Sequence, residues 1–444
     1  MAPTNTASGS RCLSSISPGR RIPVPLRHAL LVGVFVALAG CAHPNGVLKP
    51  IQAAAPEGSI ENLLVVTTRK PSGDPATLYT GQRDRSFSLD EIAVSIPPDS
   101  HRKVGEVQWP KRLPPNPETD FATVGVRHLA PTQQAGSEWL ARHLPKSGSV
   151  LVFVHGFDNK YEDAVFRFAQ IAHDSKADAA PVLFTWPSGG SLFDYNYDRE
   201  STIYSRDGLE KLLHLLANDR RVHDVSILAH SMGTWLAMES LRQMAIREGR
   251  VAPKIRNVIL ASPDIDVDVF ARQYKDLGKR HPNFTVFVSQ DDRALAVSRL
   301  IAGNVNRLGQ IDPSAEPYRS AAEKAGITIV DLTRLQAEDS AHHDKFASSP
   351  EIVQAIGTRL VAGQSLTESS IGLGDRITML AAGTAKAVGT GVGLAVSAPI
   401  SVVDPGTRRN LSGQAGNLVQ QVGGPASNAR QETKAATELL SSKD

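Results

Sequence analysis

Short apolar runs alternate with stretches of helical spacing along the middle of the chain. The runs are rich in β-branched and aromatic residues, which is typical of strands buried on both faces. They cover residues 149–154, 182–184, 225–229, 258–260, 283–289 and 327–332. Between them, residues 161–172, 209–216 and 234–241 have the composition or apolar spacing of helices. This alternation predicts an α/β fold, a mostly parallel sheet with helices on both faces.

A serine stands between one of these runs and the helical stretch that follows it. In the sequence Ala229-His230-Ser231-Met232-Gly233, small residues lie two positions before and two after the serine. A sharp strand-to-helix turn needs small residues there and leaves both the hydroxyl and the next backbone N–H exposed. Gly233 meets this requirement fully, and Ala229 meets it with one extra methyl. The pattern predicts a nucleophile at Ser231; the alternative is an ordinary helix N-cap.

A second turn at the same edge of the predicted sheet could stabilise negative charge. The run at residues 149–154 ends in His155-Gly156-Phe157, before the helical stretch at 161–172. The backbone N–H groups of Phe157 and Met232 would then point at the oxyanion of a tetrahedral intermediate. The alternative is that Gly156 only makes a turn.

Three aspartates are candidates for the acid that would orient a catalytic base. Asp291 and Asp292 follow the run at 283–289, and Asp264 follows the run at 258–260. A carboxylate just beyond a strand lies at the carboxyl edge of the sheet, where sites in open α/β folds are found. Loop aspartates also form turns, and spacing alone does not separate the three.

Of the thirteen histidines, the pair after the last predicted strand is best placed to provide the catalytic base. His342 and His343 follow the last run, at 327–332, within a loop. Serine, acid and histidine then come in the chain order of one class of serine hydrolase. A metal site made from His342, His343 and Asp344 is disfavoured, because three consecutive side chains cannot easily converge on one ion.

Taken together, these segments resemble a bacterial family of uncharacterised α/β-hydrolases of the esterase and lipase superfamily. The resemblance runs from about Asn62 to Leu360. It rests on the sequences at 62–69, 150–157, 182–189, 197–201, 229–233, 261–270 and 289–295. The end of one strand, Trp186-Pro187-Ser188-Gly189, and the serine motif at 229–233 are together specific.

The resemblance implies an α/β-hydrolase fold and a triad of Ser231, Asp292 and His343, with Phe157 and Met232 as oxyanion donors. Asp292 is favoured by its position before Ala294-Leu295, and His343 by its spacing to Phe346. The expected reaction is cleavage of an acyl bond, most simply a carboxylic ester of a small molecule or lipid, without metal or organic cofactor. The ester class is expected by analogy with the fold alone. The alternative is a non-catalytic envelope protein that uses the fold for binding or scaffolding.

The first forty residues have the pattern of an export signal. They contain four arginines and no acidic residue, and an apolar core at 29–39 stops at Leu38-Ala39-Gly40-Cys41. This core is shorter than the roughly 20 residues of a membrane-spanning helix, and small residues before a cysteine are typical of a bacterial lipoprotein signal. We therefore expect cleavage before Cys41 and lipidation of Cys41. The protein would be anchored in the cell envelope, outside the cytoplasmic membrane. Ala42 favours the outer membrane, by analogy with enteric bacteria.

Removal of this signal changes the charge of the chain. The formal net charge is +3, and loss of the four arginines gives 3 − 4 = −1, so nucleic-acid binding is not expected. The sequence has two cysteines, Cys12 and Cys41; one leaves with the signal and the other carries the lipid. No disulfide is therefore expected within the mature chain.

The domain organisation follows from these segments. We expect a signal peptide over residues 1–40, a flexible tether over 41–60 and a hydrolase domain over 61–365. Residues 366–444 form an Ala/Gly-rich and then polar tail, which we expect to be partly disordered. The apolar part of this tail, at about 377–403, is a weak candidate for a membrane segment, because glycines, Lys386 and Pro399 interrupt it.

Overall fold

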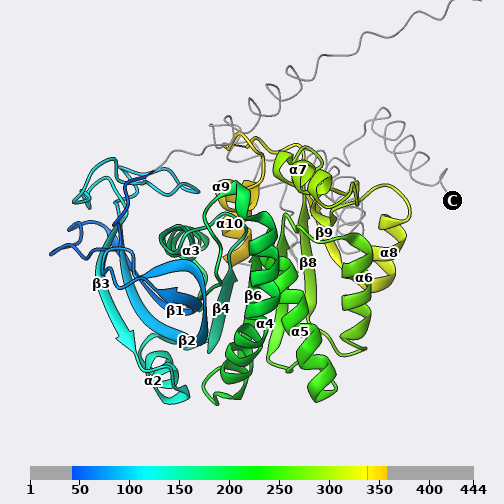
Figure 1. Cartoon of the computed structure of the whole chain (residues 1–444), viewed down its shortest axis with the longest axis horizontal. Helices are drawn as coiled ribbons and strands as arrows, with labels where there is room; N and C mark the ends of the chain where they lie inside the picture. Colours follow the sequence, from blue (N-terminus) through cyan, green and yellow to red (C-terminus); the bar gives the residue numbers. More distant parts are fainter. Residues whose placement is uncertain (1–42, 338, 358–444) are drawn as a thin grey trace, which may run out of the picture. The chain divides into compact units, whose positions relative to one another are not determined.

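A computed structural model describes residues 43–337 and 339–357 of the 444-residue chain. It contains one nine-stranded sheet with the order β3-β2-β1-β5-β4-β6-β7-β8-β9 (Figure 1). The strands are β1 (Ser59–Pro71), β2 (Tyr79–Ile96), β3 (Ala122–Leu129), β4 (Ser149–Val154), β5 (Ala180–Thr185), β6 (Asp224–His230), β7 (Ile255–Ala261), β8 (Asn283–Val288) and β9 (Thr328–Asp331).

Helices follow most strands of the parallel part of the sheet. The α-helices are α2 (Gln133–His143), α3 (Tyr161–Ser175), α4 (Tyr195–Asn218), α5 (Gly233–Glu248), α6 (Val267–Asp276), α7 (Arg293–Ile301), α8 (Tyr318–Ala325), α9 (Lys345–Ser348) and α10 (Pro350–Ala355). Two short 3₁₀ helices are η1 (Leu192–Asp194) and η2 (Leu308–Gln310).

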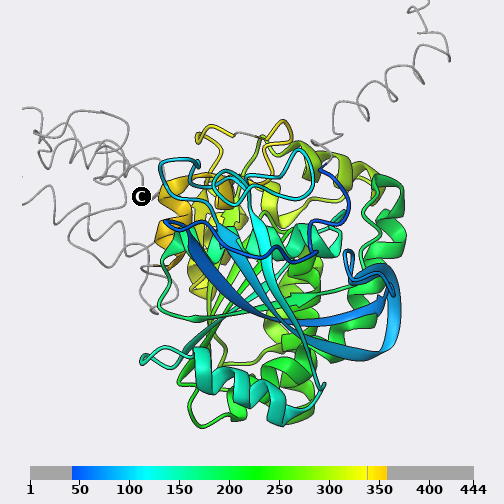
Figure 2. The ribbon, with the colours of Figure 1, turned by 90° about the vertical axis from the view of Figure 1, so that its left-hand side faces the viewer.

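The parallel strands run from β1 through β5, β4, β6, β7 and β8 to β9, whereas β2 pairs antiparallel with both β1 and β3. Figure 2 shows this antiparallel end of the sheet from the side. The α/β fold expected from the sequence is thus confirmed, and the antiparallel strands extend it at one edge.

Two hydrophobic cores lie on opposite faces of the sheet. One packs α4, α5 and α6 against the sheet, with residues such as Leu213, Leu241 and Phe270. The other packs α3, α9 and α10 on the reverse face, with residues such as Phe168 and Phe346. In Figure 1, α4, α5 and α6 lie in front of the sheet and α3 and α10 lie behind it.

The order of strands reverses at β4. Helix α3 leads from β4 to β5 on one side, and α4 then crosses to β6 on the other side of β4. The loops after β4 and β6 therefore diverge to opposite faces at the carboxyl edge of the sheet. In open α/β sheets this switch point is where ligands bind.

Part of the segment expected to be a flexible tether instead packs on the domain. Val47 and Leu48 are fully buried, and the Ile51 N–H donates to Thr123 O at 2.9 Å. Val47 and Leu48 give this segment a hydrophobic contact with the domain. The high content of Ala, Pro and Gly around them had suggested a flexible chain instead. A free tether over all of 41–60 is therefore wrong for the residues from His43 onward.

The other expectations for the ends of the chain concern residues that the structure does not describe. The signal peptide, Cys41 and the tail at 366–444 all lie outside the described residues. Within the part of the chain that the structure describes, no helix is both long and apolar enough to span a membrane.

Candidate active site

Ser231 lies at a strained turn between β6 and α5. Its φ is 51°, in the left-handed region that non-glycine residues seldom occupy. The turn is held on both sides: the Ser231 N–H donates to Ala261 O at 2.9 Å, and Ser231 O accepts from the Asp264 N–H at 3.2 Å. Such strain is characteristic of a serine whose hydroxyl is exposed at the top of a sheet. The geometry of the turn is thus that predicted from the sequence.

The two glycines of the predicted site are required by close packing. A Cβ on Gly233 would stand 2.2 Å from His155 O. A Cβ on Gly156 would stand 2.8 Å from the Ser231 Cβ. The loop after β4 therefore packs directly on the serine turn, and neither position has room for a side chain.

The two predicted oxyanion donors lie in these packed turns. Phe157 belongs to the loop at residues 155–160, called here the β4 loop, and Met232 directly follows Ser231. Within the described ranges, the N–H groups of Phe157 and Met232 have no hydrogen-bond acceptor in the protein. Unpaired backbone donors beside a serine hydroxyl are what oxyanion stabilisation needs.

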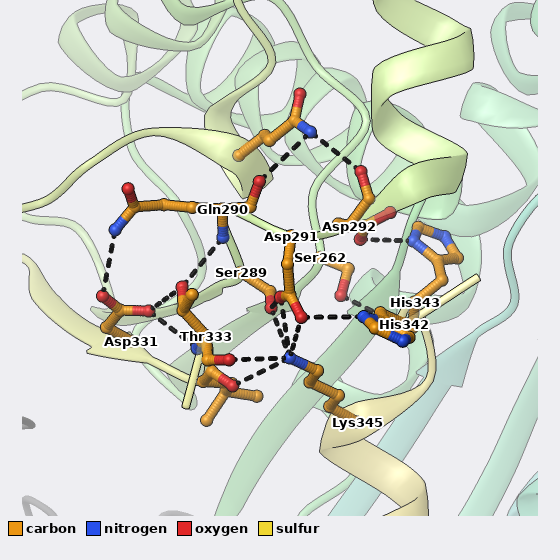
Figure 3. Close-up of polar contacts among 12 residues, drawn as sticks. Ser262, Ser289, Gln290, Asp291, Asp292, Asp331, Thr333, His342, His343 and Lys345 are labelled. Carbon is orange, nitrogen blue, oxygen red and sulfur yellow. Dashed lines mark hydrogen bonds and ion pairs between the residues drawn. The ribbon is translucent and has the colours of Figure 1, made fainter. Parts of the chain in front are cut away.

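His343 and Asp292 form a direct pair. The His343 Nδ1 and the Asp292 Oδ2 are 2.7 Å apart, and the Asp292 side chain is fully buried (Figure 3). Asp292 also caps α7, since its Oδ1 accepts from the Leu295 N–H at 2.9 Å. A carboxylate anchored by a helix start holds the imidazole in one orientation and one tautomer.

The pair has a strong electrostatic effect on the histidine. Burial alone would lower the pKa of His343, but the charge of Asp292 and its hydrogen bond outweigh burial and raise this pKa to about 9. The carboxylates of Asp344 and Asp264 act in the same direction. The imidazolium is thus stabilised beside the serine turn, as a base that accepts a proton during the reaction requires.

Two contacts join the histidine to the serine turn. The ring of His230, next to Ser231 in the chain, lies 4.7 Å from the ring of His343. The Ser262 hydroxyl donates to His343 O at 2.9 Å, and Ser262 follows Ala261, which binds the Ser231 N–H. Burial and the nearby His343 lower the pKa of His230 to about 3, so His230 is a neutral packing residue.

The neighbouring candidates, His342 and Asp291, form a second pair beside the first. The His342 Nδ1 and the Asp291 Oδ2 are also 2.7 Å apart (Figure 3). Asp291 additionally accepts from the Lys345 ammonium at 2.7 Å, and Lys345 is almost fully buried. Burial would raise the pKa of Asp291, but hydrogen bonds from Lys345, Ser289 and His342 lower it to about 2. The side chains of this second pair are more exposed than those of His343 and Asp292, and its carboxylate is already bound to Lys345.

Lys345 joins several backbone groups to this pair. Its ammonium also donates to Ser289 Oγ at 3.0 Å, Leu332 O at 3.1 Å and Thr333 O at 3.2 Å. Sequence reasoning missed Lys345, and the only signal was its position two residues after His343. It holds the end of β8, the end of β9 and the histidine loop (residues 339–344) together.

The third acid, Asp264, has partners of its own. It accepts from Ser298 at 2.5 Å and from Tyr195 at 3.1 Å, and it lies 3.1 Å from Arg307 Nε. These contacts tie α7 to the start of α4. The structure therefore brings Asp292, and not Asp264, into hydrogen-bond contact with His343.

A comparison with protein families agrees with the α/β fold. The model of a family described as an alpha/beta hydrolase of unknown function (DUF900) matches residues 132–359, just over half of the chain. The chain belongs to this family. Membership and fold support hydrolase activity. The matched residues include the serine turn, the β4 loop, the histidine loop and all three acid candidates.

Individual relatives of this α/β-hydrolase are distant. An uncharacterized protein of Nostoc sp. is 35% identical over 63 residues, which are 14% of this chain. The match spans only about a sixth (16%) of the length of that protein.

The solved structures that are similar to this chain are also distant from it in sequence. A Pyrobaculum calidifontis esterase is 12% identical, with a TM-score of 0.31, over 76% of this chain and 92% of that one. Carboxyl esterase 2 of Tuber melanosporum is 12% identical, with a TM-score of 0.33, over 78% of this chain and all of that one.

Proposed function

We propose that this α/β-hydrolase is a serine hydrolase that cleaves an acyl bond, most simply a carboxylic ester, through an acyl-enzyme intermediate. The observation that carries the proposal is the combination of a strained serine turn at Ser231 with a buried Asp292–His343 pair linked to the same turn. A carboxylate-oriented histidine packed against the turn that carries a serine is the arrangement that activates the serine hydroxyl.

The proposed steps assign one role to each group. The Ser231 hydroxyl attacks the carbonyl carbon while His343 takes its proton. The N–H groups of Phe157 and Met232 bind the resulting oxyanion. The intermediate collapses, the alcohol leaves with the proton from His343, and Ser231 keeps the acyl group. A water molecule then attacks the acyl carbonyl while His343 takes its proton. The bond to Ser231 breaks, His343 returns the proton to the serine oxygen, and the carboxylic acid leaves.

The test uses a fluorophosphonate probe and p-nitrophenyl acetate on the purified domain. We expect wild-type protein to be labelled and to hydrolyse the ester, and Ser231→Ala to lose both. Ser320→Ala, at an exposed serine on α8, serves as the matched control and should behave as wild type. Hydrolysis retained by Ser231→Ala would refute the assignment of the nucleophile. A wild-type protein that neither labels nor hydrolyses would favour the non-catalytic binding role instead.

We also propose that Cys41 carries the lipid that anchors the enzyme in the cell envelope. The support comes from the sequence of residues 1–41, namely the arginines, the short apolar core and Leu38-Ala39-Gly40 before the cysteine.

This location is tested by Cys41→Ser in the bacterial host. The variant should remain unprocessed or mislocalised and should not incorporate labelled palmitate, whereas the wild type incorporates it. If Cys41→Ser is processed to the same size and still sediments with membranes, the anchor lies elsewhere, and the segment at 377–403 becomes the candidate.

A further inference from the structure

Arg69, at the end of β1, holds the β4 loop by several hydrogen bonds. Its side chain is buried, with 1% of its surface exposed. The guanidinium donates to Asn159 O at 2.7 Å, to Ser188 O at 3.0 Å and to His155 Nε2 at 3.4 Å. One side chain from a neighbouring strand thus touches both ends of the β4 loop and the loop after β5.

The Arg69 side chain is itself fixed in place. Its Nε donates to Thr185 Oγ1 at 2.9 Å, and Nη1 also reaches Thr80 O at 3.4 Å. Burial lowers the pKa of Arg69 to about 10, and the carboxylate of Asp198 opposes this effect. Arg69 is therefore a charged, rigid group at neutral pH, because its planar donors are all directed at fixed acceptors.

His155 transmits this constraint to the Phe157 N–H. The His155 Nε2 accepts from the Trp186 N–H at 3.0 Å as well as from Arg69, so the ring proton lies on Nδ1. That Nδ1–H donates to Gly156 O at 2.8 Å. Gly156 O and the Phe157 N–H belong to one planar peptide group, so fixing the oxygen fixes the direction of the N–H.

Asp198, on α4, holds the other side of Phe157. This buried carboxylate accepts from the Asp158 N–H at 3.4 Å and from Ser188 Oγ at 2.5 Å. The Asn159 amide donates to Phe157 O at 2.8 Å, and the Asn159 N–H donates to Ser188 Oγ at 3.1 Å. The peptide groups before and after Phe157 are thus both held by polar contacts.

We propose that Arg69 is a positioning residue for the reaction, which aims the Phe157 N–H at the oxyanion through His155, with Asp198 and Ser188 as its supports. This inference rests on the proposed function, and it assigns a role to a residue far from the triad in the sequence. The effect belongs to the transition state, because the oxyanion charge develops only there.

The test compares Arg69→Lys with the wild type on p-nitrophenyl acetate. Lysine keeps the charge but cannot bridge three acceptors with a planar fork. We expect kcat to fall about 10- to 100-fold with KM within about twofold, since losing one oxyanion donor outright costs about 10²–10³. The affinity for phenylboronic acid, whose adduct with the serine is tetrahedral, should fall in parallel. Activity is expressed per fluorophosphonate-reactive site, so that unfolded protein is not counted.

Arg102→Lys is the matched control. Arg102 is equally buried but pairs with Asp174 at the far end of α3. It should lose thermal stability and keep the wild-type kcat per reactive site. If Arg69→Lys behaves like Arg102→Lys, the inference is overturned. If Arg69→Lys does not fold, Ser188→Ala, which removes one hydroxyl of the same network, should show the same loss of kcat, and a wild-type kcat there would overturn it as well.

Hydrogen exchange separates this inference from the proposed function. Amides of residues 155–159 should exchange faster in Arg69→Lys than in the wild type, whether or not the protein hydrolyses esters. Unchanged exchange overturns the positioning role. A wild type that is never labelled refutes the proposed function and leaves no oxyanion for Phe157 to bind, so the catalytic part of the inference falls with it.

Discussion

The β4 loop and the histidine loop each present one functional group at the carboxyl edge of the sheet, but they are held in different ways. The β4 loop is held by side chains from β1, α4 and the loop after β5, which bind its backbone. The histidine loop is held by Arg293 at the start of α7, which donates to Ser340 O and Ala341 O, and by Lys345, which directly follows the loop and binds Asp291.

The difference reflects what each loop must present. The β4 loop offers a backbone N–H, whose direction depends on every torsion angle around it, so its backbone is fixed from several sides. The histidine loop offers a side chain, which a single carboxylate can aim. The first loop should therefore be sensitive to distant substitutions and the second to one acid.

The largest effect is expected from that acid. Asp292→Asn should lower kcat about 10³- to 10⁴-fold, because an amide that donates to Nδ1 holds the wrong tautomer. The asparagine can still cap α7, so the fold should survive. Steady-state kinetics with circular dichroism would check both points.

Asp264→Asn is the control for this variant. It breaks contacts to Ser298, Tyr195 and Arg307 and should act mainly on stability. A larger loss of kcat in Asp264→Asn than in Asp292→Asn, with an intact fold, would move the acid to the end of β7.

The pH dependence should separate the two loops. His343 acts as a base only when neutral, and its pKa is raised to about 9, so kcat/KM should rise with pH and level off above about 9. Asp292→Asn should move this rise to lower pH. Arg69→Lys should leave it in place, because the pKa of His343 is set by burial and by the carboxylates of Asp292, Asp344 and Asp264. If the rise in kcat/KM shifts to the same pH in Asp292→Asn and Arg69→Lys, the two loops do not act independently and this prediction is wrong.

The same histidine links pH to stability. Its folded pKa of about 9 lies above the unfolded value of 6.5, so the charged pair stabilises the fold below pH 6.5 and this contribution is lost as pH rises through 9. The difference corresponds to roughly 3 kcal/mol of unfolding free energy. Urea titrations at pH 6 and pH 10 should show it in the wild type and not in Asp292→Asn.

The smallest effect on chemistry is expected at Lys345. Lys345→Met removes a buried ammonium from Asp291 and three neutral oxygen acceptors, and should cost about 2–3 kcal/mol of stability. Water can reach the partly exposed Asp291, which limits the loss. Lys324→Met, at an exposed lysine on α8, should change little. Equal urea midpoints for the two variants would show that the lysine contributes nothing.

The sequence predicted the parts of the site that adjacent residues determine. The apolar runs located the parallel strands, and the small residues around Ser231 located the turn. The choice of Asp292 and His343 needed the family resemblance, because the pattern of adjacent aspartates and histidines left both pairs possible. The structure forms both pairs, so spacing alone could not have chosen.

Contacts between distant strands were not predictable in this way. Arg69 and Asp198 lie within segments that resemble the family, yet nothing local indicates that they meet at one loop more than 80 residues from the first of them. A charged residue after the apolar run Leu63–Val66 usually marks the exposed end of a strand. Here β5 and the β4 loop cover it, which depends on the strand order.

The positive φ of Ser231 also bears on how the sequence would drift over evolutionary time. Glycine adopts this conformation freely, whereas serine costs on the order of 1 kcal/mol. Selection for folding alone would thus favour glycine at position 231, and a lineage that kept the fold only as a scaffold would gain stability by that replacement. This chain has serine at that position despite the cost, as we expect of a residue whose hydroxyl is used.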